Sequence, residues 1–244
     1  MTTISDGKPF QFKQFAIAQD RCSMKVGTDG VLLGAWSDTT GVANILDIGT
    51  GTGLIAIMLA QRAPNAAIHA VEIDEAACGQ AKENMANSPW ADQLTCFHTS
   101  VQDFAKQSPL KYDLIVSNPP FFSGGTFSSS QDKTSVRHTV KLPHGDLLYA
   151  VRSLLAPAGR FCMILPPMEG LRFREMAGSY GIFCAKMVDV VPKQGKPVER
   201  LLLQFERQEH PVEKRQMVIN DGDAPNEWSE DFRALTGDYY ASSR

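Results

Sequence analysis

The stretch Ile45-Leu-Asp-Ile-Gly-Thr-Gly-Thr-Gly-Leu54 decides the fold, because an apolar segment runs into three closely spaced glycines and then into a second apolar segment. The first segment is typical of a buried strand, and the second, which stops before Pro64, of a helix. Glycines between a strand and a helix let the backbone approach a ligand closely. We therefore predict an α/β fold with a ligand beside Gly49, Gly51 and Gly53. A purely structural turn is the alternative.

Strand and helix patterns alternate along most of the chain. We expect strands at residues 44–48, 68–71, 95–98, 112–117, 160–165, 186–191 and 200–205. We expect helices at residues 54–62, 75–87 and 145–155. This alternation predicts a largely parallel sheet that is buried on both faces. The last two strands are too close together for a helix between them, so they should form an antiparallel hairpin at one sheet edge.

Composition limits the classes of protein to consider. The chain has 244 residues, 43% hydrophobic and 21% charged, so it can bury a large core without disulfides or metal. Its five cysteines are scattered without a C-x-x-C pair, which indicates a reducing compartment and no zinc site. No stretch approaches the roughly 20 apolar residues of a membrane span, and we expect a cytoplasmic protein. The net charge of −3 leaves any nucleic-acid binding to local basic clusters.

A second motif, Asn118-Pro-Pro-Phe121, directly follows the apolar segment 113–117. Asn118 Oδ1 and the Pro119 carbonyl can accept hydrogen bonds from a planar amine, and these bonds help to free the nitrogen lone pair. Pro119 and Pro120 fix the backbone, and Phe121 offers a surface on which a flipped base can stack. Alone, the tetrapeptide is typical of an ordinary turn. Its place after the fourth strand of an α/β pattern favours a catalytic site that alkylates nitrogen.

Carboxylates follow the next two predicted strands. Glu72, about 20 residues after the glycines, is placed to accept hydrogen bonds from the hydroxyls of a cofactor ribose. Asp74 either joins it or caps the helix that begins at residue 75. Asp103, after the third strand, is placed to accept from a cofactor adenine amino group, or it lies in a surface loop.

The glycine spacing G-x-G-x-G differs from the G-x-G-x-x-G of dinucleotide sites. Together with Asp47, Glu72, Asp103 and residues 118–121, it resembles class I S-adenosylmethionine-dependent methyltransferases that act on an amino group of a base or carboxamide. Segments 15–36 and 234–240 resemble the bacterial tRNA1(Val) (adenine-37-N6)-methyltransferase family.

This resemblance implies one methyltransferase domain with a Rossmann-like sheet. Residues 1–43 would be an N-terminal extension packed beside the cofactor, residues 44–206 the catalytic core and residues 207–244 a C-terminal tail. The resemblance also implies that Lys25 and Thr28 line the methionine end of the cofactor, beside Asp47 and Asn118. The alternative for Lys25 and Thr28 is a helix start that Thr28 or Asp29 caps.

The activity implied by the resemblance is methyl transfer from S-adenosylmethionine to adenine N6 in a tRNA, at position 37 next to the anticodon. It needs no metal, no membrane and no obligate protein partner. A glutamine N5-methyltransferase of the release-factor type is the first alternative, although that family has tyrosine after the prolines and an N-terminal helical domain. A DNA adenine methyltransferase is a weaker alternative. The last is a noncatalytic module that binds S-adenosylmethionine or RNA.

Residues 121–141 form a long segment beside the expected reactive centre. We expect Phe121 to stack on the target base and three cations of this segment to contact the RNA: Lys133, Arg137 and Lys141. The alternative is that this segment is only a solvated loop. A basic rim could be extended by Arg21, Lys25, Lys193, Lys196 and Arg200.

Overall fold

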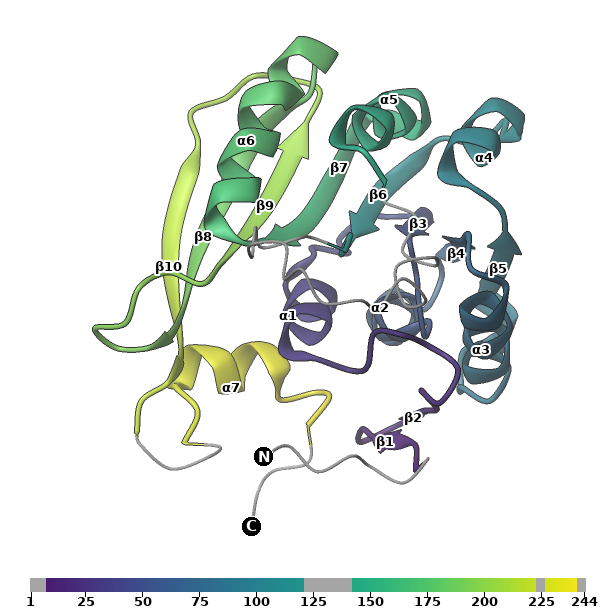
Figure 1. Ribbon diagram of the computed structural model, residues 1–244, viewed down its shortest axis with the longest axis horizontal. Coiled ribbons are helices and arrows are strands. Elements are labelled where there is room, and N and C mark those ends of the chain that lie inside the picture. The colour runs from purple at the N-terminus through teal and green to yellow at the C-terminus, as the bar shows by residue number, and fades with distance from the viewer. Residues whose placement is uncertain (1–7, 121–141, 223–226, 241–244) are drawn as a thin grey trace, which may run out of the picture.

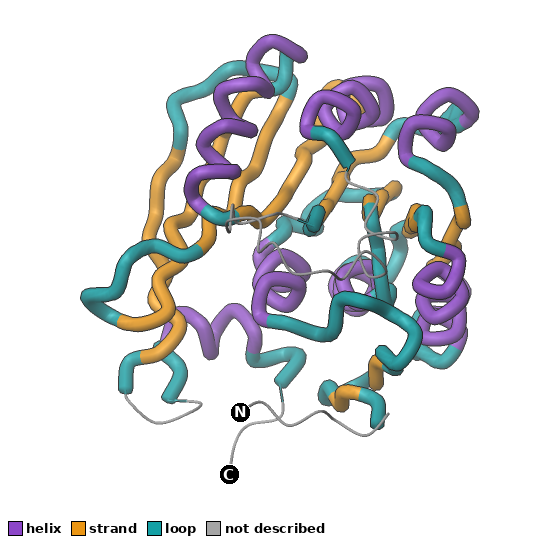
Figure 2. The backbone as a smooth tube through the Cα atoms, in the orientation of Figure 1, coloured by secondary structure: helices purple, strands orange, loops and turns teal. Residues whose placement is uncertain are grey.

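The computed structural model describes residues 8–120, 142–222 and 227–240 of the chain, in which helices cover both faces of a central sheet (Figures 1 and 2). The eight-stranded sheet has the order β10-β8-β9-β7-β6-β3-β4-β5. Its strands are β3 (Asn44–Ile48), β4 (Ala67–Glu72), β5 (Leu94–His98), β6 (Tyr112–Ser117), β7 (Leu155–Leu165), β8 (Phe183–Lys193), β9 (Arg200–Glu206) and β10 (Glu213–Asn220). A separate small hairpin pairs β1 (Phe10–Gln11) with β2 (Ala16–Ile17).

The helices are α1 (Thr28–Trp36), α2 (Leu54–Arg62), α3 (Glu75–Ala86), α4 (Val101–Gln107), α5 (His144–Leu154), α6 (Pro167–Ala177) and α7 (Glu230–Thr236). Two short 3₁₀ turns, Ala91–Gln93 and Gly178–Tyr180, complete the described elements. In the described ranges, no helix combines the length and the apolar character that crossing a bilayer requires.

The predicted α/β architecture is confirmed, and β3, β6 and α2 have the predicted bounds. The hairpin of β8 and β9 is antiparallel as expected, because β9 runs against both of its neighbours, β7 and β8. The prediction that this hairpin forms the sheet edge is wrong, because β10 pairs in parallel with β8 on the outer side of the hairpin. The first four residues of β10 are exposed and the last four only half-buried, so this strand lacks the apolar pattern that marked the other strands.

Helices α4, α6 and α7 were not predicted, and α1 was expected only in the alternative of a helix start capped by Thr28 or Asp29. Helix α1 contains Gly30 and Gly34, which disfavour a helix in isolation. Tertiary packing reverses that preference, because a Cβ at Gly34 would lie 2.9 Å from Met58 Sδ. The glycine thus permits the close approach of α1 and α2.

Side chains alternate along the strands and fill one apolar core on each face of the sheet. Ile45 and Leu114 enter the core beneath α1, α2 and α3. Leu46 and Ile115 enter the other core, which α4, α5 and α6 cover. Buried on both faces, the central strands hold their carboxyl ends in fixed positions, and the candidate site lies at these ends.

The C-terminal segment completes the first core. Helix α7 packs against β10 and α1, and Ser229 caps it by accepting a hydrogen bond from Phe232 N at 3.0 Å. Tyr239 is buried, and its hydroxyl donates to Met58 O of α2 at 3.0 Å. The segment therefore braces the helix that follows the glycine turn.

We expect Tyr239→Phe to lower the free energy of unfolding by about 0.5–1.5 kcal/mol, the usual net value of one buried hydrogen bond. Denaturant unfolding of both proteins measures this difference. Tyr240→Phe is the matched control, since the Tyr240 hydroxyl has no hydrogen bond within the described part of the chain. Equal losses in the two variants would contradict the role assigned to the Tyr239 hydroxyl.

Candidate active site

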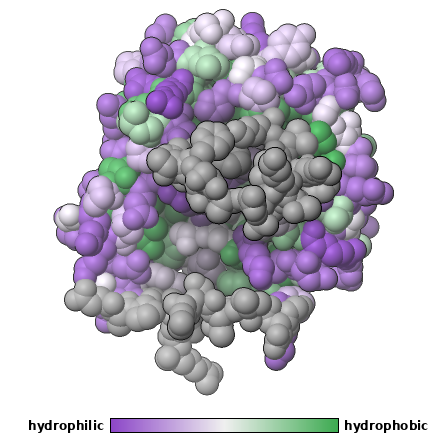
Figure 3. Space-filling view, in the orientation of Figure 1, coloured by the Kyte–Doolittle hydropathy of each residue, from purple (hydrophilic) through white to green (hydrophobic). Residues whose placement is uncertain are grey.

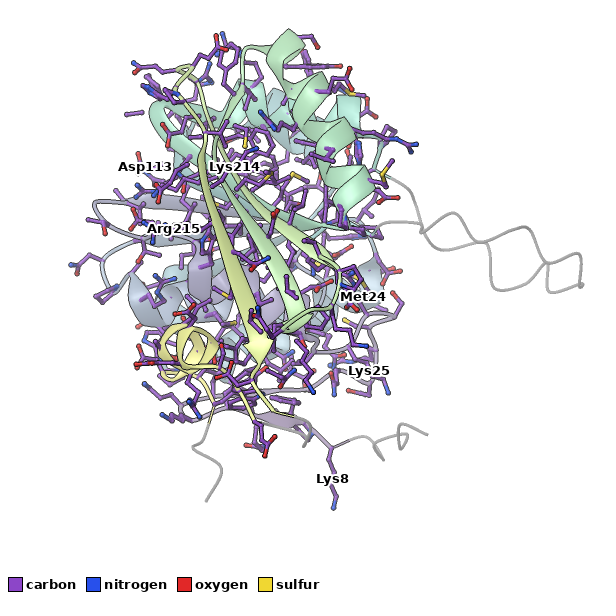
Figure 4. The ribbon with its side chains drawn as sticks, turned by 90° about the vertical axis from the view of Figure 1, so that its left-hand side faces the viewer. Lys8, Met24, Lys25, Asp113, Lys214 and Arg215 are labelled. Atoms are coloured by element: carbon purple, nitrogen blue, oxygen red, sulfur yellow. The ribbon has the colours of Figure 1, made fainter. Side chains whose placement is uncertain are left out.

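A cavity of about 650 Å³ opens at the carboxyl ends of β3, β4, β5 and β6. In an open parallel sheet this edge is where ligands bind. Figure 4 shows Met24, a wall residue of the cavity, on one side of the molecule, with Asp113 at the start of β6 on the opposite side. The wall combines backbone of the glycine turn, two carboxylates and apolar side chains, among them Gly49, Gly51, Glu72, Ile73, Asp74 and Pro119.

The glycine turn forms the floor between β3 and α2. Gly49, Gly51 and Gly53 have φ angles of 72°, 56° and 83°, a left-handed region that is costly for residues with a Cβ. Gly49 N and Thr50 N both donate to Val71 O of β4, at 2.9 and 3.2 Å. Gly49 and Gly51 line the cavity, whereas Gly53 lies against α3, where a Cβ would come within 3.4 Å of Ala81 Cα.

Glu72 ends β4 and connects three parts of the cavity wall. Its Oε2 accepts from Gly51 N at 2.9 Å, and its Oε1 accepts from Ile73 N and Asp74 N at 2.9 and 3.0 Å. The carboxylate is half-buried and lines the cavity, as the sequence predicted for a ligand-facing residue. With two oxygens it still has acceptor capacity toward a ligand hydroxyl.

Asp47 lies beneath the turn and is fully buried. Its Oδ2 accepts from Thr50 Oγ1 at 2.6 Å, while Oδ1 has no hydrogen-bond partner among the described residues. Burial raises the pKa of the Asp47 carboxyl to about 7; the Thr50 hydroxyl and the nearby Ala56 backbone oppose this rise, and the Glu72 carboxylate adds to it. Asp47 supports the turn from below and does not line the cavity.

The other two predicted carboxylates have different surroundings. Asp74 caps α3 by accepting from Ala77 N at 2.8 Å, which confirms the capping role, and it also lines the cavity. Asp103 is exposed, and its carboxylate pairs with Lys106 at 2.9 Å and accepts from Ser100 Oγ at 2.9 Å. The Lys106 and Ser100 hydrogen bonds lower the pKa of Asp103. The cavity wall here is formed by its neighbours Ser100, Val101 and Gln102.

The expected catalytic motif follows β6 directly. Pro119 and Pro120 line the cavity, whereas Asn118 is half-buried and is not itself among the wall residues. Ser117 itself is a wall residue, and its hydroxyl donates to Ile48 O at 2.9 Å, which ties the end of β6 to β3. Phe121 lies outside the described residues, as do Lys133, Arg137 and Lys141.

The N-terminal wall comes from Arg21, Cys22, Ser23 and Met24. Lys25 and Thr28, predicted from the resemblance, are exposed and not part of the cavity wall. Helix α1 does begin at Thr28, but the cap position is Gly27 and no side chain caps it. The residues of this segment that reach the cavity lie just upstream of Lys25 and Thr28.

Cys22 is the only cysteine in the described wall of the cavity. Burial raises the pKa of its thiol to about 11, with a smaller contribution from the Glu72 carboxylate. The thiol is therefore protonated at neutral pH and is a poor nucleophile.

Two residues of the expected basic rim form ion pairs. Arg200 Nε contacts Asp29 Oδ2 at 2.7 Å, which joins the start of β9 to α1. Arg21 pairs with Glu83 of α3. Arg200 therefore has a structural role, whereas Arg21 is exposed and also lines the cavity; Lys25 is an exposed cation on the same side as Met24 (Figure 4).

Known proteins resemble this chain in sequence along nearly its whole length. Residues 26–155 match the family model described as methyltransferase small domain. The chain is 44% identical, over 95% of its length and 96% of theirs, to the tRNA1(Val) (adenine(37)-N6)-methyltransferases of Histophilus somni (strain 2336) and Bacteroides thetaiotaomicron. The chain belongs to this methyltransferase family. The predicted enzyme class, with S-adenosylmethionine as methyl donor, is thereby confirmed.

A solved structure supports the fold independently. A predicted O-methyltransferase from Agrobacterium tumefaciens superimposes with a TM-score of 0.68 over 89% of this chain and 99% of that chain. The identity is 14%, so this likeness concerns the fold alone.

The raised pKa of Asp47 leads to a pH dependence of stability. Between the unperturbed value of 3.8 and about 7, the unfolded carboxyl is ionised and the folded one is protonated, so folding takes up a proton. The contribution of Asp47 should therefore fall as pH rises through this window and level off above it. The unfolding free energy of the wild type minus that of Asp47→Asn should drop by roughly 1–4 kcal/mol from pH 4 to pH 8.

Denaturant titrations at several pH values provide this measurement. Asp92→Asn, an exposed site, controls for the loss of one negative charge. A difference between wild type and Asp47→Asn that stays constant with pH would show that Asp47 titrates normally.

Proposed function

We propose that this protein transfers the methyl group of S-adenosylmethionine to N6 of adenine 37 in tRNA1(Val). The observation that carries the proposal is that Pro119 and Pro120, which directly follow Asn118, line a cavity whose floor is the glycine turn. The relatives named for this reaction match nearly the whole chain, which supports this substrate over a glutamine or DNA substrate. Because tRNA is used in the cytoplasm, we propose that the enzyme works there.

In this proposal the donor occupies the cavity. The ribose hydroxyls meet Glu72, and the methionine part lies over Gly49 and Gly51, where no Cβ obstructs the backbone. Glu72 and Asp74 provide negative charge for a ligand that carries a positive sulfonium. Ser100 and Gln102, which line the cavity after β5, are better placed for the adenine end than Asp103.

The acceptor adenine would approach from the rim. Asn118 Oδ1 and the Pro119 carbonyl accept the two N6 hydrogens, which directs the nitrogen lone pair toward the methyl carbon. Alignment of nitrogen, carbon and sulfur is the main contribution of the protein, and orientation of this kind provides roughly 7–11 kcal/mol. No strong base is needed, because the methylated nitrogen becomes acidic and releases its proton to water.

The proposed RNA contacts include Phe121 for the target base and Lys133, Arg137 and Lys141 for phosphates. Lys25 lies on the same side of the molecule as the cavity residue Met24 (Figure 4) and is a further candidate. Lys214 and Arg215 of β10 lie apart from Met24 and Lys25 in the same view, so they are not assigned to this interface. The face viewed in Figure 3 is mostly hydrophilic where its residues are described.

Asn118→Ala should abolish methyl transfer and leave donor affinity within a few-fold, because Asn118 is assigned to the acceptor amine. Calorimetric titration with S-adenosylmethionine and a transfer assay with a labelled methyl group separate the two steps. Retained turnover, or loss of donor binding together with activity, would disprove this role.

Glu72→Ala should weaken donor binding by about 1.5–3 kcal/mol, the usual range for a hydrogen bond with a charged group. Asp74→Ala is the matched comparison, since it removes a helix cap and should cost about 0.5–2 kcal/mol of stability. Calorimetry and thermal melts distinguish the effects. If Asp74→Ala affects affinity more and Glu72→Ala affects stability more, the two roles are reversed.

The substrate is tested by isolating the methylated product. Incubation with unmodified tRNA1(Val) should yield N6-methyladenosine at position 37, and tRNA1(Val) with guanosine at position 37 should yield none. Methyl incorporation into a protein glutamine, without incorporation into tRNA, would replace the proposal with the release-factor type of reaction.

A further inference from the structure

One wall of the cavity is a segment with little packing of its own. Residues 18–26, here named the strap, contain no helix or strand, and none of these residues is buried. Four of them, Arg21 to Met24, line the cavity. At its end Val26 packs against the first core. Along residues 18–25 apolar burial contributes little, and polar contacts hold this part in place.

Two buried amide side chains of α3 provide these contacts. Gln80 and Asn84 are 0% and 4% exposed and lie one helical turn apart, on the face of α3 toward the strap. Polar side chains in a helix interior cost free energy unless their hydrogen bonds are satisfied. Both amides find their partners outside α3.

Asn84 joins the strap to the glycine turn. Its Oδ1 accepts from Ala18 N at 2.9 Å, and its Nδ2 donates to Ala18 O and to Thr52 O, each at 2.8 Å. The Asn84 side chain thus satisfies both the N–H and the carbonyl of Ala18, as a neighbouring strand would. Thr52 directly precedes Gly53, so this one amide fixes the strap relative to the turn under the proposed donor.

Gln80 holds the next part of the strap. Its Oε1 accepts from Arg21 N at 2.8 Å, and its Nε2 donates to Asp20 Oδ1 at 2.8 Å. Arg21 begins the wall, so this bond is made at the point where the strap reaches the cavity. The Arg21–Glu83 ion pair is exposed and contributes little by comparison.

We infer that Gln80 and Asn84 are positioning residues for methyl-donor binding, because they hold the strap against the cavity without touching the donor. The inference rests on the proposed function, in which the donor occupies this cavity. It explains why α3 carries two amides on a buried face where apolar residues would otherwise be expected. Removing either amide should free the strap and weaken donor binding while the chemical step remains intact.

The experiment compares Gln80→Met and Asn84→Ala with Cys78→Ala, a buried control on α3 that contacts Cys96. Hydrogen exchange of peptides covering residues 18–26 should be about tenfold faster in both amide variants, with β3 unchanged. Their donor Kd and KM should rise by about tenfold, with kcat at saturating donor within a few-fold. Cys78→Ala should lower the melting temperature without these changes.

The possible failures are distinguishable. Faster strap exchange with an unchanged donor Kd would overturn the inference and leave the proposed function intact. Gln80→Met is the milder variant and serves alone if Asn84→Ala does not fold. Unchanged hydrogen exchange of the strap in Gln80→Met would also overturn the inference. A wild-type protein that does not bind S-adenosylmethionine in calorimetry would disprove the proposed function itself, and the inference with it.

Discussion

The site depends on the hydrogen bonds that the Glu72 carboxylate accepts. This carboxylate accepts three backbone N–H groups, one from the glycine turn at Gly51 and two from the start of the next segment at Ile73 and Asp74. These N–H groups lie where two strands end and two helices begin, and they would otherwise lack partners. The same side chain thus shapes the cavity and presents the remaining acceptor capacity to a ligand.

Asp47 and the glycines complete this arrangement at a cost in stability. The three glycines of the turn have left-handed backbone conformations, and the buried Asp47 carboxyl has one oxygen without a hydrogen-bond partner among the described residues. A buried polar atom of this kind is typical of functional sites and rare in a core that only has to be stable. The surrounding sheet, buried on both faces, supplies the rigidity that maintains them.

The strap gives the site a second level of organisation. The sheet edge and the glycine turn are formed by backbone hydrogen bonds and apolar packing, whereas the strap depends on amide side chains from α3. A cavity with one weakly packed wall can change shape at that wall without disturbing the sheet.

The sequence by itself determined the α/β class, the bounds of β3, β6 and α2, and the two motifs that meet at the cavity, because periodicity and glycine or proline punctuation are local signals. It also placed Glu72 correctly at the cavity, since a strand end has a fixed position in a parallel sheet. Only the tertiary structure decided that β10 forms the edge of the sheet, that residues 21–24 rather than Lys25 and Thr28 line the cavity, and that Gln80 and Asn84 hold them. The strap contacts join residues about 60 positions apart in the chain, and β10 has no apolar pattern. No local sequence signal encodes either outcome.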